Sequence, residues 1–130
     1  MKTEMIRKNN TDIALIHSQQ CLIQDAASAL EFVMNVKYET GCTNIAVNKE
    51  AVAEEFFVLS NCLAGEILQK LVTYGIRLAL YGDFTGYTSK PLKDLMYESN
   101  MGRDFYFQPD IEQAISLPYP GENDCFLLYL

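Results

Sequence analysis

Polar side chains that could bind a small molecule follow the apolar run IRLALYG: Asp83, Thr85, Thr88, Ser89 and Lys90. The next segment, SKPLKDLMYESN, has the spacing of a helix, so its first backbone N–H groups would face an anion. Lys90 would add a positive charge. The same residues also suit a helix N-cap at Thr88 or Ser89 and a turn at Asp83, which need no ligand. Both interpretations stay open at this point, and capping is the more common use of such residues.

The chain does not bring together the side chains of a recognisable catalytic or metal site. Glu66 could act as a general base, but a single carboxylate without a second group is typical of a solvated helix face. His17 is the single histidine, and the cysteines have no CxxC spacing: Cys21, Cys42, Cys62 and Cys125. GDFTG also lacks the spacing of a glycine-rich phosphate loop. We therefore predict no catalytic residue, no metal and no cofactor, with cysteines that are reduced and mostly buried.

Composition restricts the class of protein further. The chain has 130 residues, 49% of them hydrophobic and 21% charged, as expected for one globular domain. A net charge of −7 and scattered Lys and Arg argue against nucleic acid as a partner. No apolar run is long enough for a bilayer and the N-terminus lacks a signal-peptide core, so we expect a cytoplasmic protein without membrane contact.

The hydrophobic pattern alternates strands with helices. EMIRK and DIALIH predict an N-terminal hairpin, and the strands TNIAVN, IRLALYG and DFYFQ are separated by helical segments. The predicted helices are DAASALEFVMNVKYETG, SNCLAGEILQKLVTYG, SKPLKDLMYESN and PDIEQAISL, while KEAVAEEFF is predicted as a helical turn or loop. This order predicts an α/β fold with a mixed, mostly parallel sheet of about four to five strands and about four helices.

Several residues predict how these helices begin, end and pack. Asp25 suits an N-cap, and Gly41 and Gly75 suit helix ends. Buried stripes are predicted at Ala27, Leu30, Val33 and Met34, and at Leu63, Ile67, Leu68, Leu71 and Val72. Gly65, inside the second of these helices, predicts a close approach of another segment.

The run IRLALYG predicts a strand in the middle of the sheet, because a nearly continuous apolar segment suits burial on both faces. The carboxyl ends of parallel strands meet at one edge, where ligands and partners of α/β proteins usually bind. The polar loop after Gly82 is expected at that edge.

We predict a domain over residues 1–117 and an extension over residues 118–130. The extension ends in the apolar run CFLLYL. An uncovered apolar strand would favour aggregation, so this run is expected to pair with the sheet of its own chain or across a homodimer, and both options stay open.

The segment from FF at 56–57 through LAGEILQK, GDF and TSKPLKDLMYESN resembles a bacterial family called domain of unknown function 4180. Members share the LAGEILQK helix, the GDF strand end and the YESN segment. The resemblance covers most of the chain, from about EMIRKN to IEQAISL. It implies a fold and leaves the activity open.

The order of strands and helices is also similar to the STAS domain of bacterial anti-sigma factor antagonists. That resemblance implies docking on a partner protein, and phosphorylation of a Ser or Thr at the start of the second helix. The corresponding segment here is LSNCLAG, in which Asn61 and Cys62 take the expected hydroxyl position and Ser60 lies one position early. Ser60 is therefore the candidate for phosphorylation, with an ordinary N-cap as the alternative.

The sequence and these resemblances favour a non-enzymatic, regulatory protein-interaction module. The alternative is a protein that binds a small molecule or anion, or an enzyme that acts on one, with Asp83, Thr88, Ser89, Lys90 and Glu66 around one crevice. A homodimer closed by the C-terminal strand is a third option.

Overall fold

The computed structural model describes residues 2–8, 11–58 and 63–117. Its centre is a five-stranded mixed sheet with the order β1-β2-β3-β4-β5. The strands are β1 (Lys2–Lys8), β2 (Thr11–His17), β3 (Asn44–Asn48), β4 (Arg77–Tyr81) and β5 (Phe105–Gln108). β1 and β2 form an antiparallel hairpin in which Lys2 pairs with His17, and the other neighbouring strands are parallel. The predicted mixed sheet with an N-terminal hairpin is confirmed.

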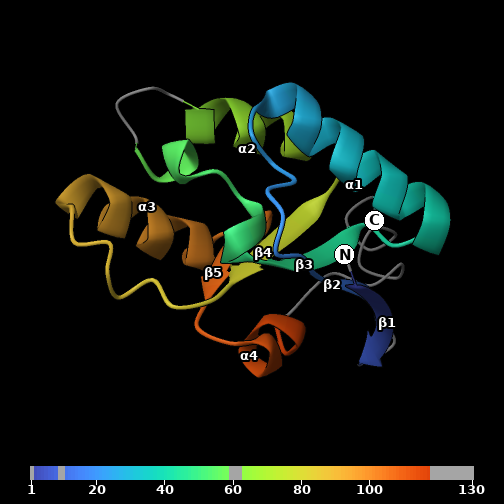
Figure 1. The fold of residues 1–130 in the computed structure, drawn as a ribbon. Helices are drawn as coiled ribbons and strands as arrows, with labels where there is room; N and C mark the ends of the chain where they lie inside the picture. The colour runs from blue at the N-terminus through green and yellow to red at the C-terminus, as the bar shows by residue number, and fades with distance from the viewer. Residues whose placement is uncertain (1, 9–10, 59–62, 118–130) are drawn as a thin grey trace, which may run out of the picture.

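Within the described residues, four α-helices connect and cover the strands: α1 (Ala26–Thr40), α2 (Leu63–Thr73), α3 (Lys90–Met101) and α4 (Ile111–Ile115). Figure 1 shows α1, α2 and α3 on one side of the sheet and the short α4 on the other. The ambiguous segment after β3 forms two 3₁₀ helices, η1 (Lys49–Ala51) and η2 (Glu54–Phe57). The prediction of a helical turn there is confirmed.

Local hydrogen bonds fix the ends of these helices. Asp25 accepts from the Ser28 N–H at 2.7 Å, and the Ser28 hydroxyl oxygen accepts in return from the Asp25 N–H at 3.0 Å. The bond from the Ser28 N–H lowers the pKa of Asp25 below its usual value. α1 is followed by Gly41 at φ 75°, a left-handed conformation that glycine adopts without strain.

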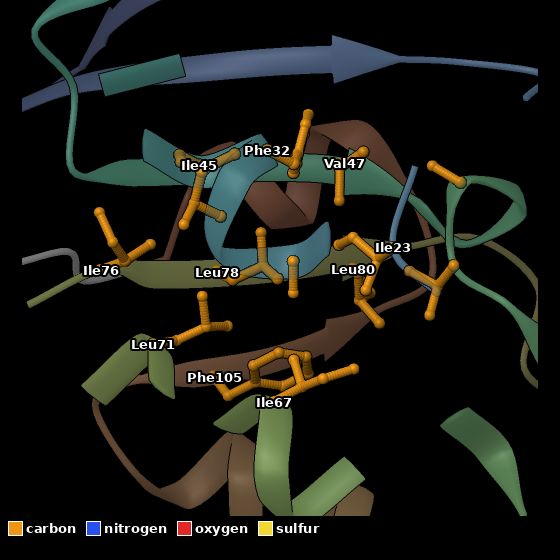
Figure 2. Close-up of a cluster of buried hydrophobic side chains, with 14 of the residues drawn as sticks. Ile23, Phe32, Ile45, Val47, Ile67, Leu71, Ile76, Leu78, Leu80 and Phe105 are labelled. Carbon is orange, nitrogen blue, oxygen red and sulfur yellow. The ribbon is translucent and has the colours of Figure 1, made fainter. Parts of the chain in front are cut away.

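The main core lies between the sheet and the three helices α1, α2 and α3. Figure 2 shows side chains from β3 and β4, such as Ile45, Leu78 and Leu80, in the same buried cluster as Ile67 and Leu71 of α2. Each of these five side chains is almost fully buried. Their burial is the main stabilising contribution on this side of the sheet.

The predicted helix stripes are partly wrong. Ala27 is exposed, and the buried side chains of α1 are Ala29, Phe32, Val33 and Val36. The side chain of Val72 is 53% exposed, because neighbouring residues of a helix point in different directions and Leu71 is the one that faces the core. A Cβ atom added to Gly65 would meet nothing within 4 Å, so the expected close approach is also wrong.

β4 is buried on both faces, as its sequence predicts. Leu78 and Leu80 belong to the main core, whereas Ala79 and Tyr81 point to a second apolar cluster on the opposite face. β3 and β5 flank this strand, with Ala79 opposite Ala46 on one side and Tyr106 on the other. The loop that follows β4 therefore begins from a rigid strand.

β5 forms one edge of the sheet, and a side chain from α3 protects it. The Phe107 N–H donates to the Oδ1 atom of Asn100 at 2.8 Å, and the Gln108 side-chain amide donates to the same atom at 3.3 Å. Asn100 is the last residue of the YESN segment. This contact occupies a backbone donor that an edge strand would otherwise offer to another chain.

Some predictions fall outside the described residues, namely those for Ser60, Cys62, Cys125 and the extension 118–130. The boundary at Leu117 and the modification of Ser60 therefore stay predictions. Of the two remaining cysteines, Cys42 is buried and Cys21 is exposed. The expectation of buried cysteines is thus confirmed for Cys42 and wrong for Cys21.

Candidate functional site

The candidate site is the edge of the sheet where the four parallel strands end. β2 ends at His17, β3 at Asn48, β4 at Tyr81 and β5 at Gln108. The polar loop 83–89 follows β4 at this edge, as the parallel arrangement requires. η1 follows β3 directly, so Lys49 and Glu50 also lie there.

Asn48 connects the ends of β2 and β3 through its side chain. Its Oδ1 atom accepts from the Ser18 N–H at 2.8 Å, and its Nδ2 atom donates to the Ser18 carbonyl at 2.7 Å. The Nδ2 atom also donates to Glu50 at 3.1 Å. Asn48 is 2% exposed and Ser18 is 3% exposed. This side chain therefore extends the pairing of the two strands beyond the backbone ladder, where unpaired groups would be costly.

Tyr81 adds a second cross-strand contact. Its hydroxyl donates to the Ile16 carbonyl at 2.8 Å and lies 3.4 Å from Nδ1 of His17. Burial raises the pKa of Tyr81 above its usual value, and the charges of Glu50 and Glu4 raise it further. The Tyr81 hydroxyl therefore connects the end of β4 with the end of β2.

The loop after β4 is held by its own side chains. Asp83 accepts from the Thr85 N–H at 2.9 Å and from the Thr85 hydroxyl at 2.6 Å, and these bonds lower the pKa of Asp83. Gly82 has a φ of 151°, which a residue with a side chain rarely adopts. The Lys49 ammonium donates to the Asp83 carbonyl and so attaches the loop to η1.

Aromatic rings gather beside this loop. The rings of Phe57 and Tyr87 stack with 4.6 Å between centroids, and Phe84 lies 6.1 Å from Phe57 and 6.2 Å from Tyr87. The Lys49 ammonium lies 5.8 Å from the Phe84 centroid and 5.2 Å from the Tyr87 centroid, within the range of cation–π attraction. Phe84 and Tyr87 are half-buried.

A carboxylate borders these rings. The Tyr87 hydroxyl donates to both carboxylate oxygens of Glu54, each at 3.1 Å. Burial, together with this hydrogen bond and the charge of Glu54, raises the pKa of Tyr87 to about 12. We call the surface formed by Lys49, Glu54, Phe84 and Tyr87 the carboxyl-edge patch.

The residues predicted to bind a small molecule or anion are only partly brought together. Asp83, Thr88, Ser89 and Lys90 lie along one loop and helix start. Glu66 is exposed on α2, and within the described residues no hydrogen bond or ion pair joins it to that loop.

Ser89 and Lys90 have local partners. The Ser89 hydroxyl oxygen accepts from the Leu92 N–H at 3.3 Å, which makes Ser89 the N-cap of α3. Lys90 pairs with Asp94 at 2.8 Å, one helical turn further on. Thr88 is exposed next to them. The capping interpretation of Ser89 is therefore confirmed.

Sequence reasoning missed Lys49, Glu54 and Phe57, which all contact residues of the loop. They lie in KEAVAEEFF, which has neither strand nor clear helix periodicity. The order of the strands could have located them. β3 lies parallel to β4, so the segment that follows β3 begins at the same edge of the sheet as the loop after β4.

A pocket lies away from this patch, between α2 and the segment that leads into β5. It has a volume of about 190 Å³ and its lining includes Leu68, Leu71, Val72, Arg103 and Phe105. It therefore lies toward the opposite end of β5 from the carboxyl-edge patch.

In the described part of the chain, no group of three or more His, Cys, Asp or Glu is placed to hold a metal ion. None of the described helices is both long and apolar enough to cross a membrane.

The fold defines the class of protein: an α/β protein whose parallel sheet is extended by an N-terminal hairpin. An aromatic and acidic surface lies at the carboxyl edge of this sheet. Residues 8–117 match the family described as a domain of unknown function (DUF4180), and the chain belongs to this family. No curated protein and no solved structure matches the chain significantly.

Proposed function

We propose that this protein is a non-enzymatic, regulatory interaction module that docks a partner protein on the carboxyl-edge patch. The observation that carries the proposal is the packing of the half-buried rings of Phe84 and Tyr87 under Lys49 and beside Glu54. Aromatic rings that are partly exposed and firmly held are typical anchors of protein interfaces.

The rigidity of the patch supports docking. The Asp83–Thr85 hydrogen bonds hold the loop, and Lys49 attaches it to η1. The ring of Phe57 stacks on the ring of Tyr87. A surface that is already ordered loses little conformational entropy on binding.

The charge around the patch indicates the chemistry of the partner. Glu50 and Glu54 are exposed beside the rings, in a chain with a net charge of −7. We therefore expect a partner segment that carries Lys or Arg next to an apolar or aromatic side chain, because complementary charge speeds association and sets orientation. The regulatory role follows from the resemblance to anti-sigma factor antagonists and stays part of the proposal.

The anion-binding alternative has less support at this edge. The serine that would offer its hydroxyl caps α3, and Lys90 already pairs with Asp94.

Site-specific photocrosslinking in the native cell tests the proposal. A benzophenone amino acid at Thr88, which is exposed next to the patch, is compared with one at Tyr38, which is 92% exposed on α1. We expect one reproducible adduct with another protein from position 88, which disappears at high salt and in Glu54→Lys. Equal adducts from both positions, or none, would overturn the proposal, and an adduct of twice the chain mass would assign the patch to a homodimer.

A further inference from the structure

The sheet face opposite α1, α2 and α3 has a second apolar cluster that α4 covers only in part. The cluster consists of Ile13, Leu15, Ala46, Ala79, Tyr81, Tyr106 and Ala114. The described packing of α4 against the sheet falls mainly on β3, β4 and β5. A five-residue helix is about 8 Å long, whereas five strands span about 19 Å. The β2 part of this face therefore extends beyond α4.

The side chains in this part are apolar and buried. Ile13 is 1% exposed and Leu15 is 9% exposed. Leu117, the last described residue of the chain, packs against the same cluster, as does Ile6 of β1. The polypeptide thus leaves the described region directly at this face.

Two buried polar atoms on the same face have no hydrogen-bond partner among the described residues: Oδ1 of Asn44 and Nε of Arg77. The two residues are paired across β3 and β4. They share a face with Ala46 and Ala79, because side chains two apart along a strand point the same way. The Asn44 oxygen could accept a hydrogen bond from the N–H of a peptide group, and the Arg77 Nε–H could donate one to a peptide C=O.

We propose that residues 118–130 of the same chain dock on this face, with the apolar run CFLLYL over Ile13 and Leu15. A passing peptide group would then pair with Asn44 and Arg77. From Leu117 to Cys125 the chain can extend by about 27 Å, while β1 lies about 14 Å from β4. The segment can therefore reach across the face.

Docking within the chain is favoured over docking of a second copy. The segment starts at the face it would cover, which gives it a high effective concentration there. The contact lies on the opposite side of the sheet from Phe84 and Tyr87, which pack against the main core. The inference is therefore independent of the proposed function.

Crosslinking of the full chain tests the docking. Ile6 packs against this cluster, whereas its neighbour Met5 points to the other face and is 57% exposed. Ile6→Cys and Met5→Cys are made separately in a chain in which Cys21 and Cys62 are replaced by serine. A short bifunctional thiol reagent then probes proximity to Cys125.

We expect a within-chain crosslink between positions 6 and 125 in monomeric material, several-fold stronger than between positions 5 and 125. Equal yields, or no crosslink from Ile6→Cys, would overturn the proposal. A crosslink found only between chains would also overturn it, by assigning the face to a second copy.

A variant of the segment itself provides an independent readout. Leu127→Asp is combined with Leu128→Asp in the Ile6→Cys chain. Neighbouring residues of an extended segment point to opposite faces, so one carboxylate would face the sheet whichever face docks, and a buried unpaired charge is costly. The crosslink should weaken several-fold while circular dichroism shows an unchanged fold. An unchanged crosslink would show that apolar docking is not its cause.

Discussion

Replacing Asn48 tests the most constrained part of the carboxyl edge. Its side chain gives the buried Ser18 residue both a donor and an acceptor, at 2.7 and 2.8 Å. In Asn48→Ala both backbone groups of Ser18 lose their partners. An unsatisfied buried group costs about 1 to 3 kcal/mol. Because water can reach a strand end, we take the lower part of this range for each group and expect a loss of about 2 to 3 kcal/mol in the free energy of unfolding.

Asn48→Asp is the matched control, because it keeps the size of the side chain and the acceptor for the Ser18 N–H. It replaces the Nδ2 donor by a carboxylate oxygen that faces the Ser18 carbonyl and Glu50. This variant should be destabilised at neutral pH and should recover part of the loss when acid protonates the new carboxyl group.

Urea unfolding at two pH values measures both effects, with an unchanged m-value as the check for two-state behaviour. Two results would refute the reasoning. One is a loss below about 0.5 kcal/mol in Asn48→Ala, the usual range of surface substitutions. The other is an Asn48→Asp protein as stable as the natural one at neutral pH.

The remaining predictions concern Tyr87, two glycines and Asn100. Tyr87 keeps its proton to a pKa of about 12 in the folded protein, against an ordinary value of 10.0. The folded state therefore holds more protons between these values, and stability should fall as pH rises through this window. Solvent screening keeps the loss below the roughly 2.7 kcal/mol of a fully buried group. Because the pKa of Tyr81 is raised as well, absorbance titration should show a late phenolate component that loses one tyrosine in Tyr87→Phe. A late component of unchanged size in this variant would contradict the prediction. Gly82→Ala should cost about 1 to 3 kcal/mol in urea unfolding, because φ is 151° and the new Cβ would lie 3.3 Å from the Lys49 side chain. Gly65→Ala should instead stabilise α2 by about 0.5 to 1 kcal/mol, and equal effects of the two substitutions would be inconsistent with the structure. Asn100→Ala should cost about 1 kcal/mol and increase concentration-dependent association in sedimentation, because the Phe107 N–H at the sheet edge loses its partner. A monomer at all concentrations would show that Asn100 does not guard this edge.

The strands and helices were predictable because each has a strong local signal. IRLALYG is apolar and bounded by glycines, and Asp25 and Gly41 have the side chain and the backbone freedom that helix ends require. The faces of the helices were less predictable. Ala27 and Val72 fit an apolar stripe by spacing, yet both are exposed, because the orientation of a helix is set by its neighbours.

The sequence predicted where the candidate site lies, but not most of the residues that form it. Parallel strands put the loop after β4 at the correct edge, and Ser89 could be recognised as a cap. Lys49 and Glu54 come from a segment without periodicity, so their contacts with the loop depend on tertiary structure alone. Asn48 was overlooked for a similar reason, since a buried asparagine at the end of an apolar strand is informative only once its partner, Ser18, is known.

The hydrogen bonds of the carboxyl edge also bear on the choice between catalysis and the docking of a partner protein. Asn48, Asp83 and Ser89 have the polar atoms that bind substrates in many enzymes, but here these atoms hold strand ends, a turn and a helix start. A catalytic group must keep an atom available to the reacting molecule. A docking surface needs only shape and charge that are fixed in advance, and the rings of Phe84 and Tyr87 with their neighbouring carboxylates offer both. The polar network at this edge holds strand ends, a turn and a helix start, and this supports our proposal that the edge docks a partner protein.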